Sequence, residues 1–115
     1  MASNCLFCRI AAGDIPSTTV YSDDDVYAFR DINPAAPQHI LIIPRKHVQS
    51  LADVEVEDAA MLGRLLLSAR RIAEQEGFAQ TGFRSVFNTG VDGGQTVGHM
   101  HLHLLAGRAL HWPPG

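Results

Sequence analysis

The sequence has few cysteines and no long apolar run, and each shortage excludes a class of protein. Cys5 and Cys8 are its only cysteines, and they are too close together to close a useful disulfide loop. A thiol pair in a reducing cytoplasm is therefore expected rather than a disulfide scaffold. No apolar run approaches the roughly 18 residues of a membrane span, and the N-terminus lacks the pattern of a signal peptide.

The excess of acidic over basic residues is also small. The formal net charge is -3 at pH 7, so we expect no long-range attraction to a nucleic-acid polymer, although local donors can still hold a mononucleotide phosphate. The composition that remains, 46% hydrophobic and 18% charged over 115 residues, is typical of a globular protein. It predicts one domain over 1–115, with a core at about 5–107 and a tail at 108–115.

Apolar periodicity predicts one long helix over about 55–76 and a short one over 5–13, which Asn4 could cap. Runs rich in β-branched and aromatic residues predict strands at 18–22, 26–30, 39–43, 83–88 and 99–106. The first two strands are spaced for a hairpin, and there is no regular β-α-β alternation. We therefore predict an α+β fold, an antiparallel five-stranded sheet with one long and one short helix.

Three histidines alternate with apolar residues at 99–103. On a strand, His99, His101 and His103 share one face, while the residues between them face the core. The row would span roughly 13 Å, too long for one metal ion to bind all three from a straight strand. Imidazole can attack, accept or donate protons at neutral pH, so the row favours one nucleophile with helpers. A merely exposed polar face remains the alternative.

The run 99–105 has the pattern His, apolar, His, apolar, His, apolar, apolar. It resembles the signature of the histidine triad family, and the C-terminal stretch 111–115 resembles the Hint branch of nucleoside phosphoramidases. Further blocks similar to this family follow its order: Asp14-Ile15-Pro16, Ala28-Phe29-Arg30-Asp31-Ile32, Pro37-Gln38-His39, Ile43-Pro44-Arg45-Lys46-His47 and Gly93-Gly94-Gln95-Thr96.

The resemblance implies a role for each histidine. His101 would attack the α-phosphorus and form a nucleotidyl-histidine, which water then releases as a nucleoside monophosphate. His103 would assist proton transfer beside the phosphate. His99 would orient the nucleophile, and His39 would be a further partner.

The resemblance also implies a nucleotide pocket. Asp31 would accept hydrogen bonds from the ribose hydroxyls, and Gly94 would bring backbone donors close to phosphate. Thr96 stands where the family more often has Ser, and its extra methyl could alter the fit of the leaving group. The remaining implied residues are the base slot of Phe7, Ile10, Phe29, Ile32 and Leu41, the phosphate or leaving-group contacts Asn88 and Gln95, and the specificity residue Trp112. Core packing alone would also explain Phe29 and Leu41.

Cys5 and Cys8 form a C-x-x-C motif, which supplies two of the four ligands that a zinc site needs. Some family members that resemble this sequence complete such a site with residues equivalent to His47 and His99. A zinc ion held by four protein ligands would be structural. Two reduced cysteines without metal remain the alternative, and a redox role is a third.

The resemblance thus implies a hydrolase that cleaves the P–N bond of purine nucleoside 5′-phosphoramidates and needs no cofactor for its chemistry. It also implies a homodimer, with the long helix and a sheet edge at the interface and a sheet continuous across it. A dinucleoside polyphosphate hydrolase or nucleotidyl transferase of the same superfamily, and a nucleotide-binding regulatory protein with little turnover, remain alternatives.

Overall fold

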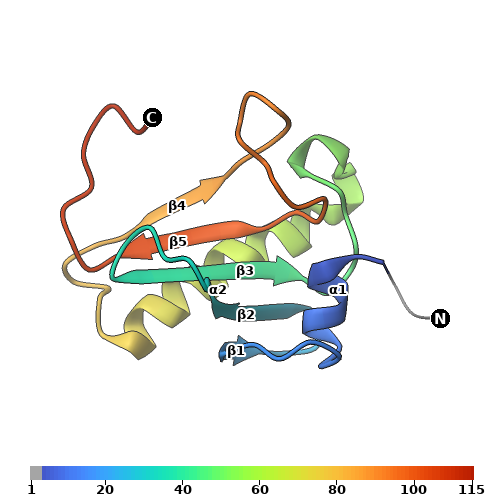
Figure 1. Cartoon of the computed structure of the whole chain (residues 1–115), viewed down its shortest axis with the longest axis horizontal. Coiled ribbons are helices and arrows are strands. Elements are labelled where there is room, and N and C mark those ends of the chain that lie inside the picture. The colour runs from blue at the N-terminus through green and yellow to red at the C-terminus, as the bar shows by residue number, and fades with distance from the viewer. Residues whose placement is uncertain (1–3) are drawn as a thin grey trace.

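A five-stranded antiparallel sheet is the centre of the structure, a computed structural model that describes residues 4–115 (Figure 1). Its strand order is β1-β2-β3-β5-β4. The strands are β1 (Thr19–Ser22), β2 (Val26–Arg30), β3 (Gln38–Pro44), β4 (Arg84–Phe87) and β5 (Leu102–Ala106). The helices are α1 (Leu6–Ala11) and α2 (Ala59–Glu76), with single 3-10 turns at Leu51–Asp53 and Val56–Asp58. The predicted α+β fold is confirmed.

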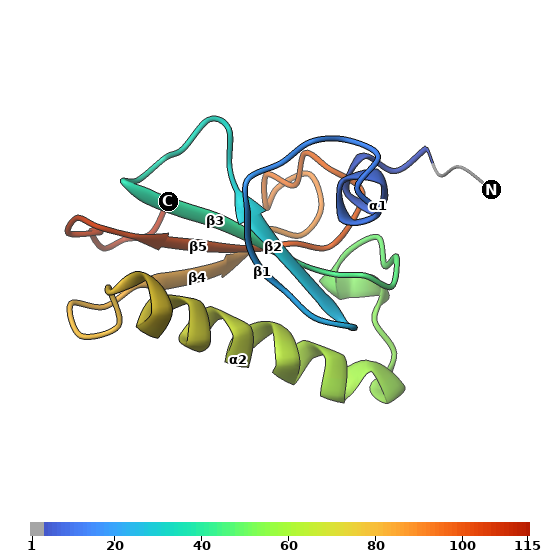
Figure 2. The same cartoon turned by 90° about the horizontal axis from the view of Figure 1, so that it is seen from below.

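The two helices lie on opposite faces of the sheet (Figure 2). Alternate residues of β3 divide between them: Ile40 and Ile42 pack on the α2 side, and Leu41 packs with α1. α2 buries Leu65 and Ile72 against the sheet. β3 is therefore covered on both faces, as its unbroken apolar run predicts. No helix among residues 4–115 is long and apolar enough to cross a membrane.

The predicted strand over 99–106 begins three residues late, at Leu102. The antiparallel register pairs Ile42 with Leu102, so Met100 would come opposite Pro44. Proline has no N–H to donate to a ladder, and the Met100 N–H instead donates to the Val48 carbonyl at 2.7 Å. The alternation of faces nevertheless continues, because Met100 packs in the same core cluster as Leu102.

Both helices begin later than predicted. The long helix is preceded by the 3-10 turn Val56–Asp58, and Gly77 ends it with a φ of 85°, a conformation that favours glycine. α1 is capped by Cys5 rather than Asn4: the Cys8 N–H donates to the Cys5 sulfur at 3.4 Å. This cap places both sulfurs at the start of the helix.

We expect Ile72→Ala to lower the free energy of unfolding by about 3 kcal/mol, because Ile72 is fully buried between α2 and the sheet. Urea unfolding monitored by circular dichroism measures the change. Gln75→Ala, on the exposed side of the same helix, is the matched control and should change stability by less than about 0.5 kcal/mol. Equal effects in the two variants would contradict the assigned core.

Candidate active site

A backbone carbonyl fixes the protonation pattern of His101. The His101 Nδ1 lies 2.8 Å from the His99 carbonyl oxygen, which can only accept. The proton of the neutral ring is therefore on Nδ1, and Nε2 keeps a free lone pair. The ring is buried, and the edge of Phe7 supports it at a centroid distance of 5.1 Å. His101 is thus held in the form that a nucleophile requires.

A chain of two hydrogen bonds places the proton of His103 on the opposite ring nitrogen from that of His101. The Ala35 N–H donates to His39 Nδ1 at 2.9 Å, so the proton of a neutral His39 is on Nε2. That Nε2 lies 2.9 Å from His103 Nδ1 and donates to it. His103 therefore carries its own proton on Nε2. Its ring centroid is 4.9 Å from that of His101, so a bare nitrogen and a protonated one come from adjacent rings.

Burial keeps this pair neutral. The pKa of His103 is lowered to about 4, mainly by burial and also by the nearby His101 and His39, while Asp31 opposes the shift. Burial also lowers the pKa of His39. The Asp31 carboxylate, whose Oδ2 lies 3.5 Å from His39 Nε2, opposes this shift. Both rings are therefore uncharged near pH 7, the form on which the hydrogen-bond chain depends.

A cavity of about 340 Å³ opens beside these rings. Its polar groups include the imidazoles of His101 and His103 and the carboxylate of Asp31, and its lining is otherwise mostly apolar. The predicted pocket residues that line it are Phe7, Ile10, Phe29, Asp31, Ile32, Leu41 and Thr96. Such a cavity can take a flat apolar ring next to a hydroxyl-bearing and anionic portion.

Other cavity residues were not predicted: Leu6, Ile15, Pro16, Ser17, Arg30 and Val97. A signal existed for three of them, since Ile15, Pro16 and Arg30 belong to blocks that resemble the family. The others follow from how α1, the segment after it and the loop before β5 fold over the sheet.

Four predicted ligand contacts lie outside the cavity lining, namely Asn88, Gly94, Gln95 and Trp112. The Gln95 amide donates to the carbonyls of Gln49 and Val97 and accepts from the Gly90 N–H, so it braces the loop. Gly94 has a φ of 79° and forms a turn there. The Trp112 side chain is 81% exposed. Their contact with a ligand stays a prediction.

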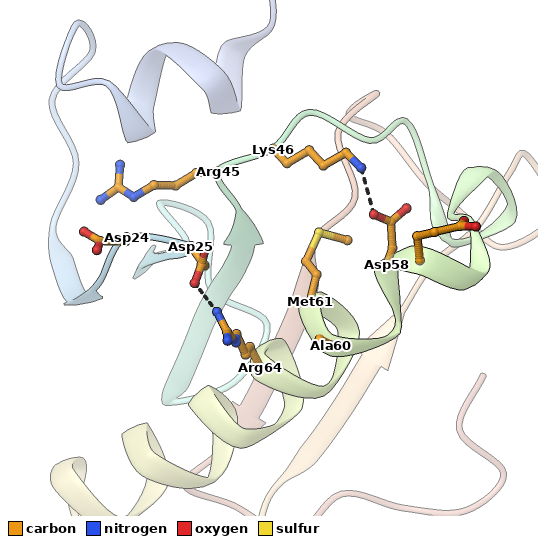
Figure 3. Close-up of a pocket in the computed structure, with 9 residues that line it drawn as sticks. Asp24, Asp25, Arg45, Lys46, Asp58, Ala60, Met61 and Arg64 are labelled. Atoms are coloured by element: carbon orange, nitrogen blue, oxygen red, sulfur yellow. Dashed lines mark hydrogen bonds and ion pairs between the residues drawn. The ribbon is translucent and has the colours of Figure 1, made fainter.

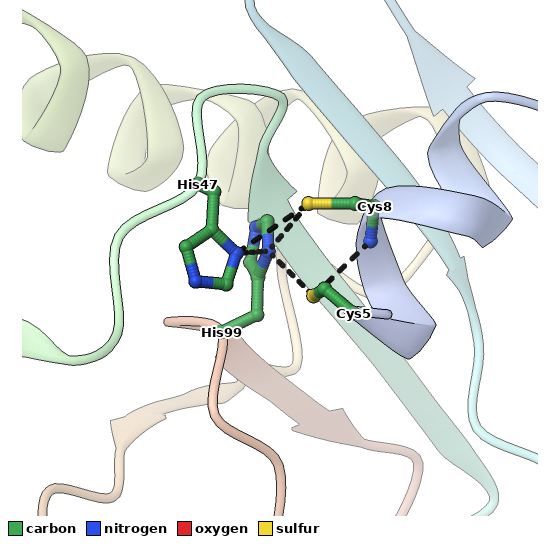
Figure 4. Close-up of side chains that lie close together, drawn as sticks. All are labelled: Cys5, Cys8, His47 and His99. Atoms are coloured by element: carbon green, nitrogen blue, oxygen red, sulfur yellow. Dashed lines mark hydrogen bonds between the residues drawn. The ribbon is translucent and has the colours of Figure 1, made fainter. Parts of the chain in front are cut away.

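Two thiols and two imidazoles meet on the α1 side of the sheet, at Cys5, Cys8, His47 and His99 (Figure 4). Cys5 Sγ and Cys8 Sγ lie 3.3 and 3.5 Å from His99 Nδ1. His47 Nδ1 lies 3.2 Å from His99 Nδ1 and 3.4 Å from Cys8 Sγ. We call these four residues the Cys-His cluster.

The Cys-His cluster has the dimensions of a tetrahedral zinc site. Zinc bonds of about 2.3 Å to sulfur and about 2.0 Å to nitrogen give ligand separations of about 3.3–3.8 Å. The separations of 3.2–3.5 Å in the cluster match them. His99 Nε2 donates to the Pro44 carbonyl at 2.8 Å, which leaves the Nδ1 lone pair facing the cluster. The donor set therefore fits a zinc-type cation.

A second hollow, of about 420 Å³, lies between the start of α2 and the β1–β2 hairpin (Figure 3). Its charged groups are largely paired with one another: Lys46 with Asp58 at 2.7 Å, and Arg64 with Asp25. The Arg45 guanidinium donates to backbone carbonyls, including that of Ala11. Because these charges are used in contacts within the chain, we assign the hollow no ligand.

Comparison with known proteins identifies the family. The HIT domain model matches residues 12–110, most of the chain. The chain belongs to the HIT family. The resemblance of its histidine triad and flanking blocks is thereby confirmed.

Named relatives and a solved structure agree with the HIT assignment. The chain is 51% identical over 110 residues to the purine nucleoside phosphoramidase of Escherichia coli K12, covering 96% of this chain and 92% of that protein. It is 49% identical over 115 residues to adenylylsulfatase HINT1 of Arabidopsis thaliana, covering 98% and 78%. A HIT family hydrolase from Legionella pneumophila Philadelphia 1 superposes with a TM-score of 0.95 at 52% identity, covering 97% and 100%. The chain is accordingly a HIT-family nucleotide hydrolase.

We expect stability to fall as the pH drops from about 6.5 to about 4. An unfolded histidine has a pKa of about 6.5, while His103 in the folded protein has a pKa of about 4. Between these values the unfolded state binds more protons than the folded state, so the free energy of unfolding rises with pH across this window. Below the window the contribution of His103 to stability is lost. The slope of the unfolding free energy against pH is proportional to the number of protons taken up on unfolding. His103→Gln should reduce that number by up to about one.

Urea titrations of wild type and His103→Gln at matched metal loading would measure this difference. The pKa values of the buried His39 and His99 are also lowered, so part of the slope should remain in the variant. Identical slopes in the two proteins would contradict a neutral, buried His103.

Proposed function

We propose that this protein hydrolyses the P–N bond of purine nucleoside 5′-phosphoramidates and releases a nucleoside monophosphate and an amine. The observation that carries the proposal is the opposite protonation of two adjacent rings. His101 offers a bare Nε2 and His103 offers an Nε2–H, each fixed by its own hydrogen bond, and both line one cavity. A nucleophile and a proton donor side by side are what displacement of an amine from phosphorus requires.

The reaction then has two displacements at phosphorus. In the first, His101 Nε2 attacks the α-phosphorus, and the P–N bond breaks as the departing nitrogen takes the Nε2 proton of His103. The negative charge left on the His103–His39 pair is balanced by the positive charge of the nucleotidyl-imidazolium on the adjacent His101. The product on the enzyme is a nucleotidyl-histidine. In the second, water attacks phosphorus and gives a proton to His103 Nε2, the P–N bond to His101 breaks, and the starting protonation states return. The His39 Nε2–H holds His103 in the correct orientation throughout.

The cavity supplies the binding energy and places the phosphorus. The apolar residues, among them Phe29 and Leu41, receive the purine base. The Asp31 Oδ2 accepts hydrogen bonds from the ribose, while its Oδ1 already accepts from the Asn33 N–H, which fixes the carboxylate. Thr96, at the cavity edge, offers a hydroxyl to the phosphate or leaving group.

The names of the relatives suggest two leaving groups, an amine and a sulfate. An amine leaves readily only when protonated, whereas sulfate is so weakly basic that it needs no proton. His103 places a proton next to the nucleophile, which favours the amine. Hydrolysis of adenylyl sulfate is the second candidate, because the same nucleophile would serve it.

A structural zinc ion in the Cys-His cluster is part of the proposal. Cys5, Cys8, His47 and His99 would fill all four positions, so the ion would have no open site and take no part in bond breaking. It would tie α1 to the segment that carries His99. Reduced thiols of this kind agree with a cytoplasmic location.

We also propose that the protein is a homodimer. The strand β4 lies at an edge of the sheet, where its backbone groups are open to a further strand. Apolar side chains are exposed nearby and along α2: Phe83 is 40% exposed, Leu66 51% and Leu67 64%. Pairing of two β4 edges would continue the sheet and cover such side chains.

His101→Ala should lower kcat for an adenosine 5′-phosphoramidate by at least about 10³-fold, because no other described group offers a bare imidazole nitrogen at the cavity. Mass spectrometry of the reaction quenched in alkaline denaturant, in which the P–N bond of the adduct survives, should find one nucleotidyl group on the wild-type peptide that contains His101. His111→Ala, an exposed histidine outside the cavity, is the matched control and should keep activity. An adduct or near-normal turnover in His101→Ala would reject the mechanism.

His103→Ala should separate the two leaving groups. We expect the rate with an alkylamine leaving group to fall by about 10²–10⁴-fold, since general acid catalysis is lost. With adenylyl sulfate the loss should be less than about 10-fold, because sulfate needs no proton. Pre-steady-state release of each leaving group measures the first displacement directly. Equal losses with both substrates would show that His103 does not act as the proton donor.

A further inference from the structure

His99 provides a first link between the Cys-His cluster and the proposed nucleophile. His99 Nδ1 lies within the cluster, and the backbone carbonyl of the same residue accepts the hydrogen bond from His101 Nδ1 at 2.8 Å. The His99 side chain is fully buried, and its Nε2 donates to the Pro44 carbonyl. The position of this one residue therefore sets both the cluster and the tautomer of His101.

A second link runs through α1. Phe7 lies between the two cysteines in the sequence, and its ring contacts His99 and His101 edge to face at centroid distances of 6.1 and 5.1 Å. Phe7 and Ile10 also form part of the cavity wall. The helix that carries the two thiols thus carries a wall of the proposed binding site.

The helix α1 needs such attachment. It has six residues, and a helix of that length is unstable by itself in water. Packing of Phe7 and Ile10 on the sheet, and the hydrogen bond from the Arg45 guanidinium to the Ala11 carbonyl, hold its middle and end. At its start, the cluster adds to the ring contacts of Phe7 and joins the helix to the triad segment.

The two thiols are also placed to react with each other. Their sulfurs lie within 4.8 Å, and both residues are only partly buried. Residues three apart in a first helical turn have Cα atoms roughly 5–6 Å apart, within the range that a disulfide spans. A bond between Cys5 and Cys8 therefore needs side-chain rotation and no rearrangement of the backbone.

We propose that the Cys-His cluster is a redox-controlled clamp on the nucleophile: with both thiolates it holds a zinc-type cation and fixes His99, and oxidation of the thiolates to a disulfide releases the cation and loosens His101. The proposal rests on the role of His101 in the proposed function. The oxidant is a hydroperoxide.

The oxidation step balances in two stages. One thiolate attacks the peroxide, the O–O bond breaks, and an alcohol leaves with one proton from solvent, which gives a sulfenic acid. The second thiolate displaces hydroxide from that sulfur, and a second proton converts the hydroxide to water. The two thiols lose two electrons and the peroxide gains them. The cation keeps only two imidazole ligands, too few to hold it, and leaves.

Two effects on catalysis follow. Without the cation, His99 Nδ1 has lost its anchor, the carbonyl that accepts from His101 moves, and His101 no longer holds one tautomer. This lowers kcat. The wall formed by Phe7 and Ile10 loosens together with α1, and this raises KM. Loss of a partner that orients an active group typically costs about 10–100-fold, the range we expect for kcat/KM.

The test follows one sample of zinc-loaded wild type through oxidation by hydrogen peroxide and recovery. We expect loss of two hydrogen atoms by intact mass, release of about one equivalent of zinc to a chromogenic chelator, and a 10–100-fold fall in kcat/KM. Long-range ¹⁵N NMR should show His101 as the Nδ1–H tautomer before oxidation and as a tautomer mixture after it. A thiol reductant with zinc should restore both signals, and a reductant with chelator should not.

The cysteine-free double variant Cys5→Ala/Cys8→Ala is the matched control. Its activity should match that of the oxidised wild type and should not respond to peroxide, which separates thiol chemistry from oxidation of methionine. If this variant does not fold, the reversible cycle on wild type still decides. Disulfide formation that leaves zinc bound, or zinc release that leaves the His101 tautomer unchanged, would overturn the proposal.

Failure of the proposed function would look different. Reduced, zinc-loaded protein would then show no phosphoramidate hydrolysis at all, while the zinc and NMR measurements would still report whether the Cys-His cluster controls His101.

Discussion

The hydrogen bond between the His101 ring and the backbone of His99 is the constraint on which the site depends. It leaves the buried nucleophile candidate with a single available nitrogen, and it does so through a main-chain atom that substitution cannot remove. The His99 side chain is in turn held by the Pro44 carbonyl at the end of β3. Proline at that position both ends the ladder toward β5 and directs its carbonyl to the imidazole. The local break in the sheet and the chemistry of the site thus have one origin.

The sheet carries different functions on its two faces. On one face α2 covers it with an aliphatic core in which Leu65 and Ile72 are fully buried. On the other face the aromatic side chains of Phe7 and Phe29 leave a cavity beside His101 and His103. Stability and binding are therefore assigned to opposite sides of β3. A short chain can keep an open cavity in this way because its main core lies elsewhere.

Much of this arrangement follows from sequence patterns. Alternation in 99–103 predicts the shared face of the histidines, and the unbroken apolar run of β3 predicts a central strand. Both hold because side-chain direction in extended backbone depends on local geometry alone. The start of β5 and the tautomers of His39 and His101 depend on contacts with Val48, Ala35 and the His99 backbone, and the cap by Cys5 depends on the Cys8 N–H. These contacts are distant in sequence or made by the main chain. Gln95 shows the same limit, because its amide braces the loop and only the folded loop reveals that role.

The single protonated nitrogen of His103 has a consequence for the order of events. In the proposed mechanism one atom gives a proton to the departing group and takes one from the incoming group, so the two groups must occupy the same place in turn. The amine has to diffuse away before water arrives, and the nucleotide waits on the protein in the meantime. Any alcohol or amine that reaches that place first receives the nucleotide instead of water. Hydrolysis and nucleotidyl transfer then differ only in the acceptor. Competition between water and other acceptors for the position that the amine has left decides which product forms.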